Sequence, residues 1–234
     1  MSYLARVERA RRLLASIEKN HSPTALASSF GAEDMVVLDL IARDGLAISI
    51  FTLDTGRLPQ ETHALIEEVR DRYGLAIDVY SPWPDSIEAY VQEHGIDGFY
   101  DGVEQRVACC NVRKVEPLRR ALSGKRGWIT GLRREQAASR TTVSETEHDA
   151  IQGKWKFNPL VDWSNEDVWD YLRENRVPYN ELHDRGYPSI GCEPCTRAVR
   201  PGEHPRAGRW WWEQEGARKE CGLHAIPVRV VETA

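Results

Sequence analysis

Short apolar strands alternate with amphipathic helices along this 234-residue chain, and this alternation constrains the fold more than any other feature. Four segments have the length and apolar character of buried strands: residues 24–28, 46–51, 76–80 and 128–131. Helices are predicted over residues 3–17, 35–42, 59–73 and 165–175. Strands separated by helices of this length indicate an α/β fold, with a mostly parallel, twisted sheet flanked by helices.

The composition is that of one globular domain. Hydrophobic residues make up 41% and charged residues 29% of the chain, which excludes intrinsic disorder. A net charge of −5 argues against a general nucleic-acid binder. No apolar run approaches the roughly 20 residues that cross a bilayer, and the N-terminus lacks the apolar core of a secretion signal. We therefore expect a cytoplasmic protein with no membrane partner.

The last third of the chain differs in character from the rest. It is rich in Trp, Arg, Gly and Pro, and one helix is predicted in it, with Ser164 as its N-cap. Such a segment is better suited to wrapping a site than to building a core. We divide the chain into an α/β domain, residues 1–200, and an irregular, mobile C-terminal segment, residues 201–234.

The five cysteines are too few for a disulfide framework. They comprise the adjacent pair Cys109 and Cys110, the Cys-x-x-Cys of Cys192 and Cys195, and Cys221. Four thiolates suit tetrahedral zinc or an iron–sulfur cluster. Adjacent ligands are awkward for one zinc ion and easier for a cluster, but the residues alone leave both open. The simpler alternative is thiols that pack as small apolar groups.

A loop of small residues, Ser28-Ser29-Phe30-Gly31, follows the first predicted strand. Backbone N–H groups there, together with the N-terminus of the next helix, suit a phosphate group. The loop is neither a Walker A motif nor G-x-G-x-x-G. Glu33 and Asp34 would repel a phosphate unless they turn away or cap other groups. An ordinary strand-to-helix turn with a serine cap is the alternative.

Basic residues concentrate in the middle of this acidic chain. Residues 106–140 contain ten Arg or Lys and two Glu. Three of these arginines follow the end of a predicted strand, where ligands bind in open α/β sheets: Arg133, Arg134 and Arg140. Arg206 and Arg209 form a second group. Guanidinium forks suit oxyanions, so a strongly anionic substrate is expected, although some of these residues simply solvate a helix face.

Cys221 stands apart from the other four cysteines. It follows Arg218 and Lys219 and precedes His224. Nearby cations favour the thiolate, which is the nucleophilic form. The alternative is an inconsequential cysteine on an exposed tail.

Six stretches, taken in this order, resemble the assimilatory adenylyl-sulfate reductase family of the adenine nucleotide alpha-hydrolase-like superfamily. The resemblance extends from about Ser28 to His224. The matching stretches are residues 29–34, 53–58, 109–118, 129–136, 191–197 and 220–224.

The resemblance implies a thioredoxin-dependent reduction of adenosine 5'-phosphosulfate to sulfite and AMP, within sulfate assimilation and cysteine biosynthesis. Cys221 would attack the sulfate sulfur, and a separate thioredoxin or glutaredoxin-like donor would release sulfite. Four cysteines would hold one [4Fe-4S] cluster per subunit: Cys109, Cys110, Cys192 and Cys195. Lys114 and His224 join Cys221 as the catalytic group. The substrate-binding group comprises Ser28, Ser29, Phe30, Gly31, Asp54, Thr55, Gly56, Gly131, Arg133, Arg134, Arg140, Arg206 and Arg209. Homo-oligomerisation is also compatible with the resemblance.

Three other functions remain open at this point. The first is reduction of 3'-phosphoadenylyl sulfate, alone or together with the unphosphorylated nucleotide. The second is a non-catalytic, nucleotide-binding iron–sulfur or zinc module. The third is a tRNA-thiolating enzyme, which the acidic net charge makes less attractive. The resemblance favours the unphosphorylated substrate because the sister enzymes usually lack the four cysteines.

Overall fold

The computed structural model describes residues 2–137, 140–213 and 223. Six strands form one sheet in the order β3-β2-β1-β4-β6-β5. Their bounds are β1 (Thr24–Ala27), β2 (Ser49–Leu53), β3 (Ile77–Tyr80), β4 (Gly127–Ile129), β5 (Thr146–Asp149) and β6 (Lys154–Phe157). All neighbours are parallel except β5 and β6. The predicted mostly parallel α/β sheet is confirmed.

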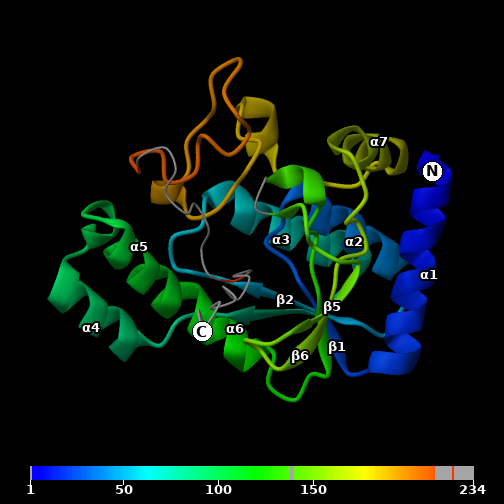
Figure 1. The fold of residues 1–234 in the computed structure, drawn as a ribbon, viewed down its shortest axis with the longest axis horizontal. Helices are drawn as coiled ribbons and strands as arrows, with labels where there is room; N and C mark the ends of the chain where they lie inside the picture. The colour runs from blue at the N-terminus through cyan, green and yellow to red at the C-terminus, as the bar shows by residue number, and fades with distance from the viewer. Residues whose placement is uncertain (1, 138–139, 214–222, 224–234) are drawn as a thin grey trace, which may run out of the picture.

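The described helices lie around this sheet (Figure 1). The α-helices are α1 (Tyr3–His21), α2 (Ala32–Arg43), α3 (Gln60–Tyr73), α4 (Pro84–His94), α5 (Val103–Cys110), α6 (Glu116–Ala121) and α7 (Asn165–Asn175). Shorter helical turns are η1 (Gly98–Tyr100), η2 (Asn111–Val115), η3 (Arg134–Gln136), η5 (Glu181–Arg185) and η6 (Glu193–Cys195). Helices α4 and α5 lie on one flank of the molecule and α1 on the opposite flank (Figure 1). No described helix is both long enough and apolar enough to cross a membrane.

Alternation along the strands gives the sheet two apolar faces. In β1, Leu26 belongs to the larger buried cluster, which includes residues of α1, α2, α3 and α7. Its neighbour Ala25 belongs to a smaller cluster with Leu118 of α6. Helices therefore cover both faces, as a parallel sheet requires.

Most predicted boundaries agree with the structure to within three residues. Gly74 ends α3 with φ 63°, in the left-handed region, and Ser164 caps α7 by accepting from the N–H of Asp167. The second strand begins at Ser49 rather than Leu46, so the first residues of that apolar run belong to the preceding connection. Pro59 immediately precedes α3 as its N-cap instead of occupying its first turn.

The strand order sets the position of the site. β1 lies between β2 and β4, so the chain reverses its direction across the sheet at the carboxyl end of β1. Open α/β sheets bind ligands in the crevice beside such a point. The loops after β1 and β4 therefore flank the expected binding crevice.

Candidate functional site

Both carboxylates that follow the first strand turn back into the protein. Asp34 accepts hydrogen bonds from the backbone N–H and the hydroxyl of Ser29, each at 2.7 Å, and from the N–H of Gly131 at 3.2 Å. Glu33 pairs with the guanidinium of Arg133 at 2.7 Å. The condition under which this loop would suit a phosphate is thus met, because neither carboxylate projects alone into the crevice.

The conformation of the loop is itself constrained. Phe30 has φ 59°, a left-handed conformation that is costly for a bulky residue, and its side chain is only 1% exposed. The Ser28 hydroxyl accepts a hydrogen bond from the Phe30 N–H at 3.2 Å. Gly31 is the N-cap of α2 and offers no side-chain cap to that helix. The N-terminus of α2, whose first N–H groups have no partner in the helix backbone, therefore begins directly after the loop.

Gly131 permits the close approach of the loops after β1 and β4. A Cβ atom at this position would lie 2.8 Å from the Cβ of Glu33 and 3.0 Å from the backbone nitrogen of Asp34. These are closer than normal contacts, so only glycine fits without moving a loop.

The pKa values of the two buried carboxyl groups are shifted in opposite directions. Burial raises the pKa of Asp34 to about 6, despite the hydrogen bonds from Ser29. Burial also acts to raise the pKa of Glu33, but the charge of Arg133 and the hydrogen bonds from Arg133 and Gln136 together leave that pKa below its ordinary value.

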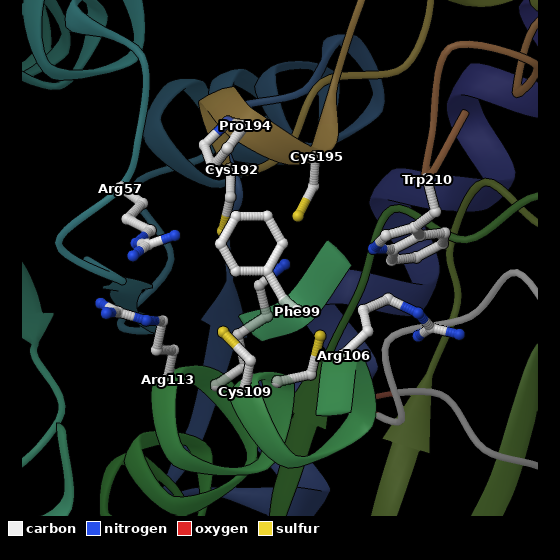
Figure 2. A pocket seen from close by; sticks show the side chains of 11 residues that line it. Arg57, Phe99, Arg106, Cys109, Arg113, Cys192, Pro194, Cys195 and Trp210 are labelled. Atoms are coloured by element: carbon white, nitrogen blue, oxygen red, sulfur yellow. The ribbon is translucent and has the colours of Figure 1, made fainter. Parts of the chain in front are cut away.

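The four cysteines predicted as a set are buried together and form no disulfide among the described residues. Cys109 and Cys110 end α5, while Cys192 and Cys195 bracket η6. In Figure 2 the sulfur atoms of Cys109, Cys192 and Cys195 face a common space. That pocket is lined by Arg57, Phe99, Arg106, Cys109, Cys110, Arg113, Lys114, Cys192, Pro194, Cys195 and Trp210.

A π-helical turn, η2, follows the adjacent thiols directly and contains Lys114. Such turns are frequent at functional sites because they locally widen a helix. Lys114 follows Cys110 by four residues along this turn, and both residues line the pocket.

The turn after β2 joins the two pairs of thiols. The Thr55 hydroxyl lies 3.2 Å from the Cys192 sulfur, and the Arg113 guanidinium donates to the Thr55 carbonyl at 2.7 Å. The N–H of Glu193 donates to the Arg57 carbonyl at 2.8 Å. The turn that was expected near the nucleoside therefore also adjoins the thiol pocket.

The four thiols are buried, and they lie beside positively charged side chains. Burial and the charge of Cys192 raise the pKa of Cys195 to about 12. Burial opposes ionisation of Cys192 too, but the charge of Lys114 and the hydrogen bond with Thr55 leave its pKa below the ordinary value. Four neighbouring thiols do not ionise together unaided in such a site.

This donor set fits an iron–sulfur cluster. Four buried thiols supply the ligands of a [4Fe-4S] centre, and Arg57, Arg113 and Lys114 line the same pocket. Across the described ranges, no three His, Cys, Asp or Glu side chains gather closely enough to hold a metal ion. The fit therefore rests on the chemistry of the thiols and their cationic surroundings.

The predicted substrate-binding arginines differ in what they contact. Arg133 is 4% exposed and donates to Glu33, Glu135 and the Trp163 carbonyl. Arg134 pairs with Asp162. These two guanidinium groups are engaged in holding the loops after β4, and direct substrate contact by them stays a prediction.

The other predicted arginines lie elsewhere around the site. Arg140 is 9% exposed and donates to Gln136. Arg209 is 7% exposed and donates to the Ile190 carbonyl at 3.0 Å, directly before the Cys-x-x-Cys turn. Arg206 is partly buried. Contact of these three arginines with phosphate or sulfate stays a prediction.

The start of the C-terminal segment pairs with the Cys-x-x-Cys turn. The N–H of Arg197 donates to the Gly208 carbonyl at 3.0 Å, and the N–H of Trp210 donates to the Cys195 carbonyl at 3.2 Å. Cys221 and His224 lie outside the described residues. Leu223, between them, packs against the apolar cluster that contains Phe51 of β2.

Residues around the thiols include several that sequence reasoning missed. Arg57 donates to the Ile96 carbonyl at 2.6 Å and stacks on Phe99, while Arg106 was counted only as part of a basic stretch. Trp210 is 1% exposed, whereas its neighbour Trp211 is 48% exposed, so the Trp run divides between core and surface. Burial of one Trp beside two arginines has no signal in the local sequence.

The strand order and the thiol pocket beside the turn after β2 define a mostly parallel α/β protein with a cysteine-lined site. Residues 23–198 match the family model of the phosphoadenosine phosphosulfate reductase domain. The chain belongs to that family.

Individual relatives agree with this assignment. An adenosine 5'-phosphosulfate reductase of Burkholderia cepacia is 54% identical over 224 residues, covering 96% of this chain and 89% of the relative. One of Allochromatium vinosum is 55% identical over 215 residues, covering 92% and 84%. The crystal structure of a phosphoadenylyl-sulfate reductase from Candida auris is 28% identical with a TM-score of 0.69, covering 81% of this chain and 90% of that one.

Proposed function

We propose that this protein reduces adenosine 5'-phosphosulfate to sulfite and AMP, in assimilatory sulfate reduction and cysteine biosynthesis. One observation carries the proposal: four buried thiols, surrounded by arginine and lysine side chains, adjoin the turn that follows β2, the neighbour of β1 in the sheet. Two relatives named for this activity share 54% and 55% identity with the chain.

Cys221 is the proposed nucleophile. Its thiolate attacks the sulfate sulfur, a sulfur–sulfur bond forms, and the sulfur–oxygen bond to the phosphate breaks. AMP leaves with the bridging oxygen, and the enzyme carries a Cys221 thiosulfonate. A thiol of a thioredoxin or glutaredoxin-like donor then attacks the Cys221 sulfur and expels sulfite. The second donor thiol resolves the mixed disulfide, so the donor dithiol supplies both electrons.

Charge is the main obstacle to this attack, because a thiolate approaches a group that is already anionic. Cations aimed at the developing charge lower that barrier. We assign this role to Lys114, Arg140, Arg206 and Arg209, and proton transfer near the thiol to His224. Arg133 and Arg134 act on the same group through the loops that they hold.

The crevice loops receive the rest of the nucleotide. The loop of Ser28, Ser29, Phe30 and Gly31 receives the phosphosulfate, and the N-terminus of α2 adds a favourable partial charge. The N–H groups of Ser28, Ser29 and Phe30 donate to Phe51, Asp34 and Ser28 and so fix the shape of this loop. Asp54, Thr55, Gly56 and Gly131 contact the nucleoside.

One [4Fe-4S] cluster per subunit is proposed on Cys109, Cys110, Cys192 and Cys195. When bound, it supplies fixed charge and a rigid link between the two thiol pairs. We assign residues 1–200 to the nucleotide-binding reductase domain and 201–234 to the active-site segment. A cytoplasmic location and homo-oligomerisation stay predictions.

The test measures sulfite release by anaerobically purified protein given adenosine 5'-phosphosulfate and reduced thioredoxin. Cys221→Ser should abolish sulfite release and retain iron, whereas Cys192→Ser should lose iron. Mass spectrometry of wild-type protein with substrate and no donor should detect a thiosulfonate on Cys221. Full sulfite release by Cys221→Ser contradicts the mechanism, and an iron-free wild-type protein contradicts the cluster.

Reduction of 3'-phosphoadenylyl sulfate is the second candidate, favoured by the likeness to the Candida auris enzyme. The same assay with the 3'-phosphorylated nucleotide separates the two. A kcat/KM that is higher for the 3'-phosphorylated nucleotide would transfer the assignment to it.

A further inference from the structure

Trp210 is held in a costly backbone conformation at the start of the C-terminal segment. Its φ is 43°, in the left-handed region, and its ring is only 1% exposed. The guanidinium of Arg106 lies 4.7 Å from the ring centroid and that of Arg209 lies 4.9 Å from it. Strain of this kind persists only where the surroundings over-determine it.

A buried ion pair fixes the same segment three residues later. Arg106 Nε donates to Glu213 Oε1 at 2.5 Å, with a second contact from Nη2 to Oε2 at 3.4 Å. The two side chains are 1% and 3% exposed. They lie 107 positions apart in the sequence, and Glu213 is the last described residue before position 223. Breaking so deeply buried an ion pair by removing one of its partners is strongly destabilising.

Arg106 also belongs to the helix that carries two of the thiols. It precedes Cys109 by three residues in α5, which places both side chains on neighbouring positions of one helix face. In Figure 2, Arg106 and Trp210 lie on one side of the thiols, with Arg57 and Arg113 on the other. The ion pair therefore joins the thiol-bearing helix to the segment that continues towards Cys221.

We propose that Arg106 and Glu213 are positioning residues for Cys221: their buried ion pair fixes the root of the active-site segment to α5. This inference rests on the proposed function, because it assigns the role of the anchored segment to delivery of the Cys221 thiol. Seven residues lie between Glu213 and Cys221. A thiol on a loosely rooted segment spends less time in line with the reacting sulfur, and a displacement of about 1 Å can cost on the order of a hundredfold in rate.

The test compares four variants of the full-length, cluster-loaded protein. Glu213→Gln and Arg106→Lys alter the pair singly, and Arg106→Met with Glu213→Leu replaces it by apolar side chains that keep the site filled. Glu203→Gln is the control, because it breaks the more exposed Arg197–Glu203 pair (2.8 Å) on the same segment. Measurements are iron content, the dissociation constant of adenosine 5'-phosphosulfate, single-turnover AMP release without donor, and alkylation of Cys221 by iodoacetamide.

Glu213→Gln and the apolar double variant should retain iron and bind the nucleotide within about twofold of wild type, while single-turnover AMP release falls at least about tenfold. AMP release by Arg106→Lys should lie between that of these two variants and that of wild type, because lysine keeps the positive charge but lacks the guanidinium group that makes two parallel hydrogen bonds. Alkylation of Cys221 should accelerate several-fold in Glu213→Gln and in the apolar double variant. Glu203→Gln should match wild type in every measurement.

Two results overturn the proposal. One is AMP release and alkylation that stay at wild-type values in iron-replete Glu213→Gln and in the double variant. The other is AMP release that falls only in proportion to lost iron, which would limit the pair to a role in folding the thiol site. If wild-type protein releases no AMP from adenosine 5'-phosphosulfate, the proposed function fails, and alkylation of Cys221 alone then decides whether the pair anchors the segment.

Discussion

The Asp34 carboxylate accepts a hydrogen bond from the backbone N–H of Gly131 across 3.2 Å, joining the loop after β1 to the loop after β4. The ion pair between Glu33 and Arg133 makes a second link between the same loops. Both loops flank the switch point of the sheet, so the two sides of the proposed nucleotide crevice are fixed to each other before any ligand binds. Pre-formed walls reduce the ordering cost of binding.

Gly131→Ala should force these loops apart. Its new Cβ would lie 3.0 Å from the Asp34 backbone nitrogen, which has no freedom to move alone. Overpacking of this kind costs about 1–3 kcal/mol. Urea unfolding should show that loss, and calorimetry with AMP should show weaker binding.

At Gly31 a Cβ would lie 3.5 Å from the Ser29 hydroxyl, so Gly31→Ala should leave the unfolding midpoint unchanged. Equal stability of the two variants would contradict the argument.

Asp34 should make stability depend on pH. Burial raises its pKa from 3.8 to about 6, so between these values the folded protein holds a proton that the unfolded chain has released. The contribution of Asp34 to stability is therefore present at low pH and is lost as pH rises through about 6. The unfolding free energy of wild type relative to Asp34→Asn should fall by roughly 3 kcal/mol between about pH 4 and 7, at about 1.4 kcal/mol per pKa unit.

Ser29→Ala provides the matched variant for this measurement. Loss of the hydroxyl that donates to Asp34 at 2.7 Å should raise the carboxyl pKa further and extend the fall to higher pH. Parallel curves for wild type and Asp34→Asn would show that Asp34 is not the titrating group.

Two nearby glycines should behave differently when replaced by alanine. A Cβ at Gly191 would lie 2.6 Å from the Arg209 Cζ, at the end of a flexible side chain, whereas a Cβ at Gly208 would collide with the backbone carbonyl of Arg197. Gly191→Ala should displace the Arg209 guanidinium, raise the KM for adenosine 5'-phosphosulfate about tenfold and leave stability nearly unchanged. Gly208→Ala should instead lower the unfolding midpoint. A KM for Gly191→Ala equal to wild type, with iron retained, would remove Arg209 from substrate binding.

Asp39 should matter for stability and not for catalysis. Its buried carboxylate accepts from the hydroxyls of Tyr73 at 2.7 Å and Tyr171 at 2.8 Å and pairs with Arg43 at 2.7 Å, tying α2 to α3 and α7. Asp39→Ala should lower the unfolding free energy by about 3 kcal/mol, because it leaves buried donors without an acceptor. Tyr73→Phe should cost about 1 kcal/mol. Urea unfolding checks both values, and unchanged sulfite release per folded molecule checks the separation from catalysis.

Elements with their own apolar signature were predictable from the sequence. Strand β1 is a short, continuously buried run, and helix α3 has a periodic pattern with the end signal Gly74, so their bounds agree closely. The β5–β6 hairpin was missed because β5 is polar and largely exposed. Helices α5 and α6 were missed because a π-helical turn separates them and their apolar residues do not repeat regularly.

The functional site likewise has features that were predictable from the sequence and features that were not. Motif spacing identified the thiols as a set, and their joint burial agrees with that prediction. The contact between Thr55 and Cys192 joins residues 137 positions apart, and the ion pair of Arg106 with Glu213 spans 107. Such contacts depend on how the sheet and its loops are packed, so no local sequence pattern predicts them.

The two thiol pairs also impose an order on biosynthesis. Cys110 leaves the ribosome long before Cys192, and no nascent fragment that stops short of Cys195 presents all four sulfur donors. Strands β1 to β6 precede Cys192, so every strand of the sheet is translated before the last two donors emerge. Iron for the proposed cluster is therefore delivered to a chain whose scaffold has already been synthesised.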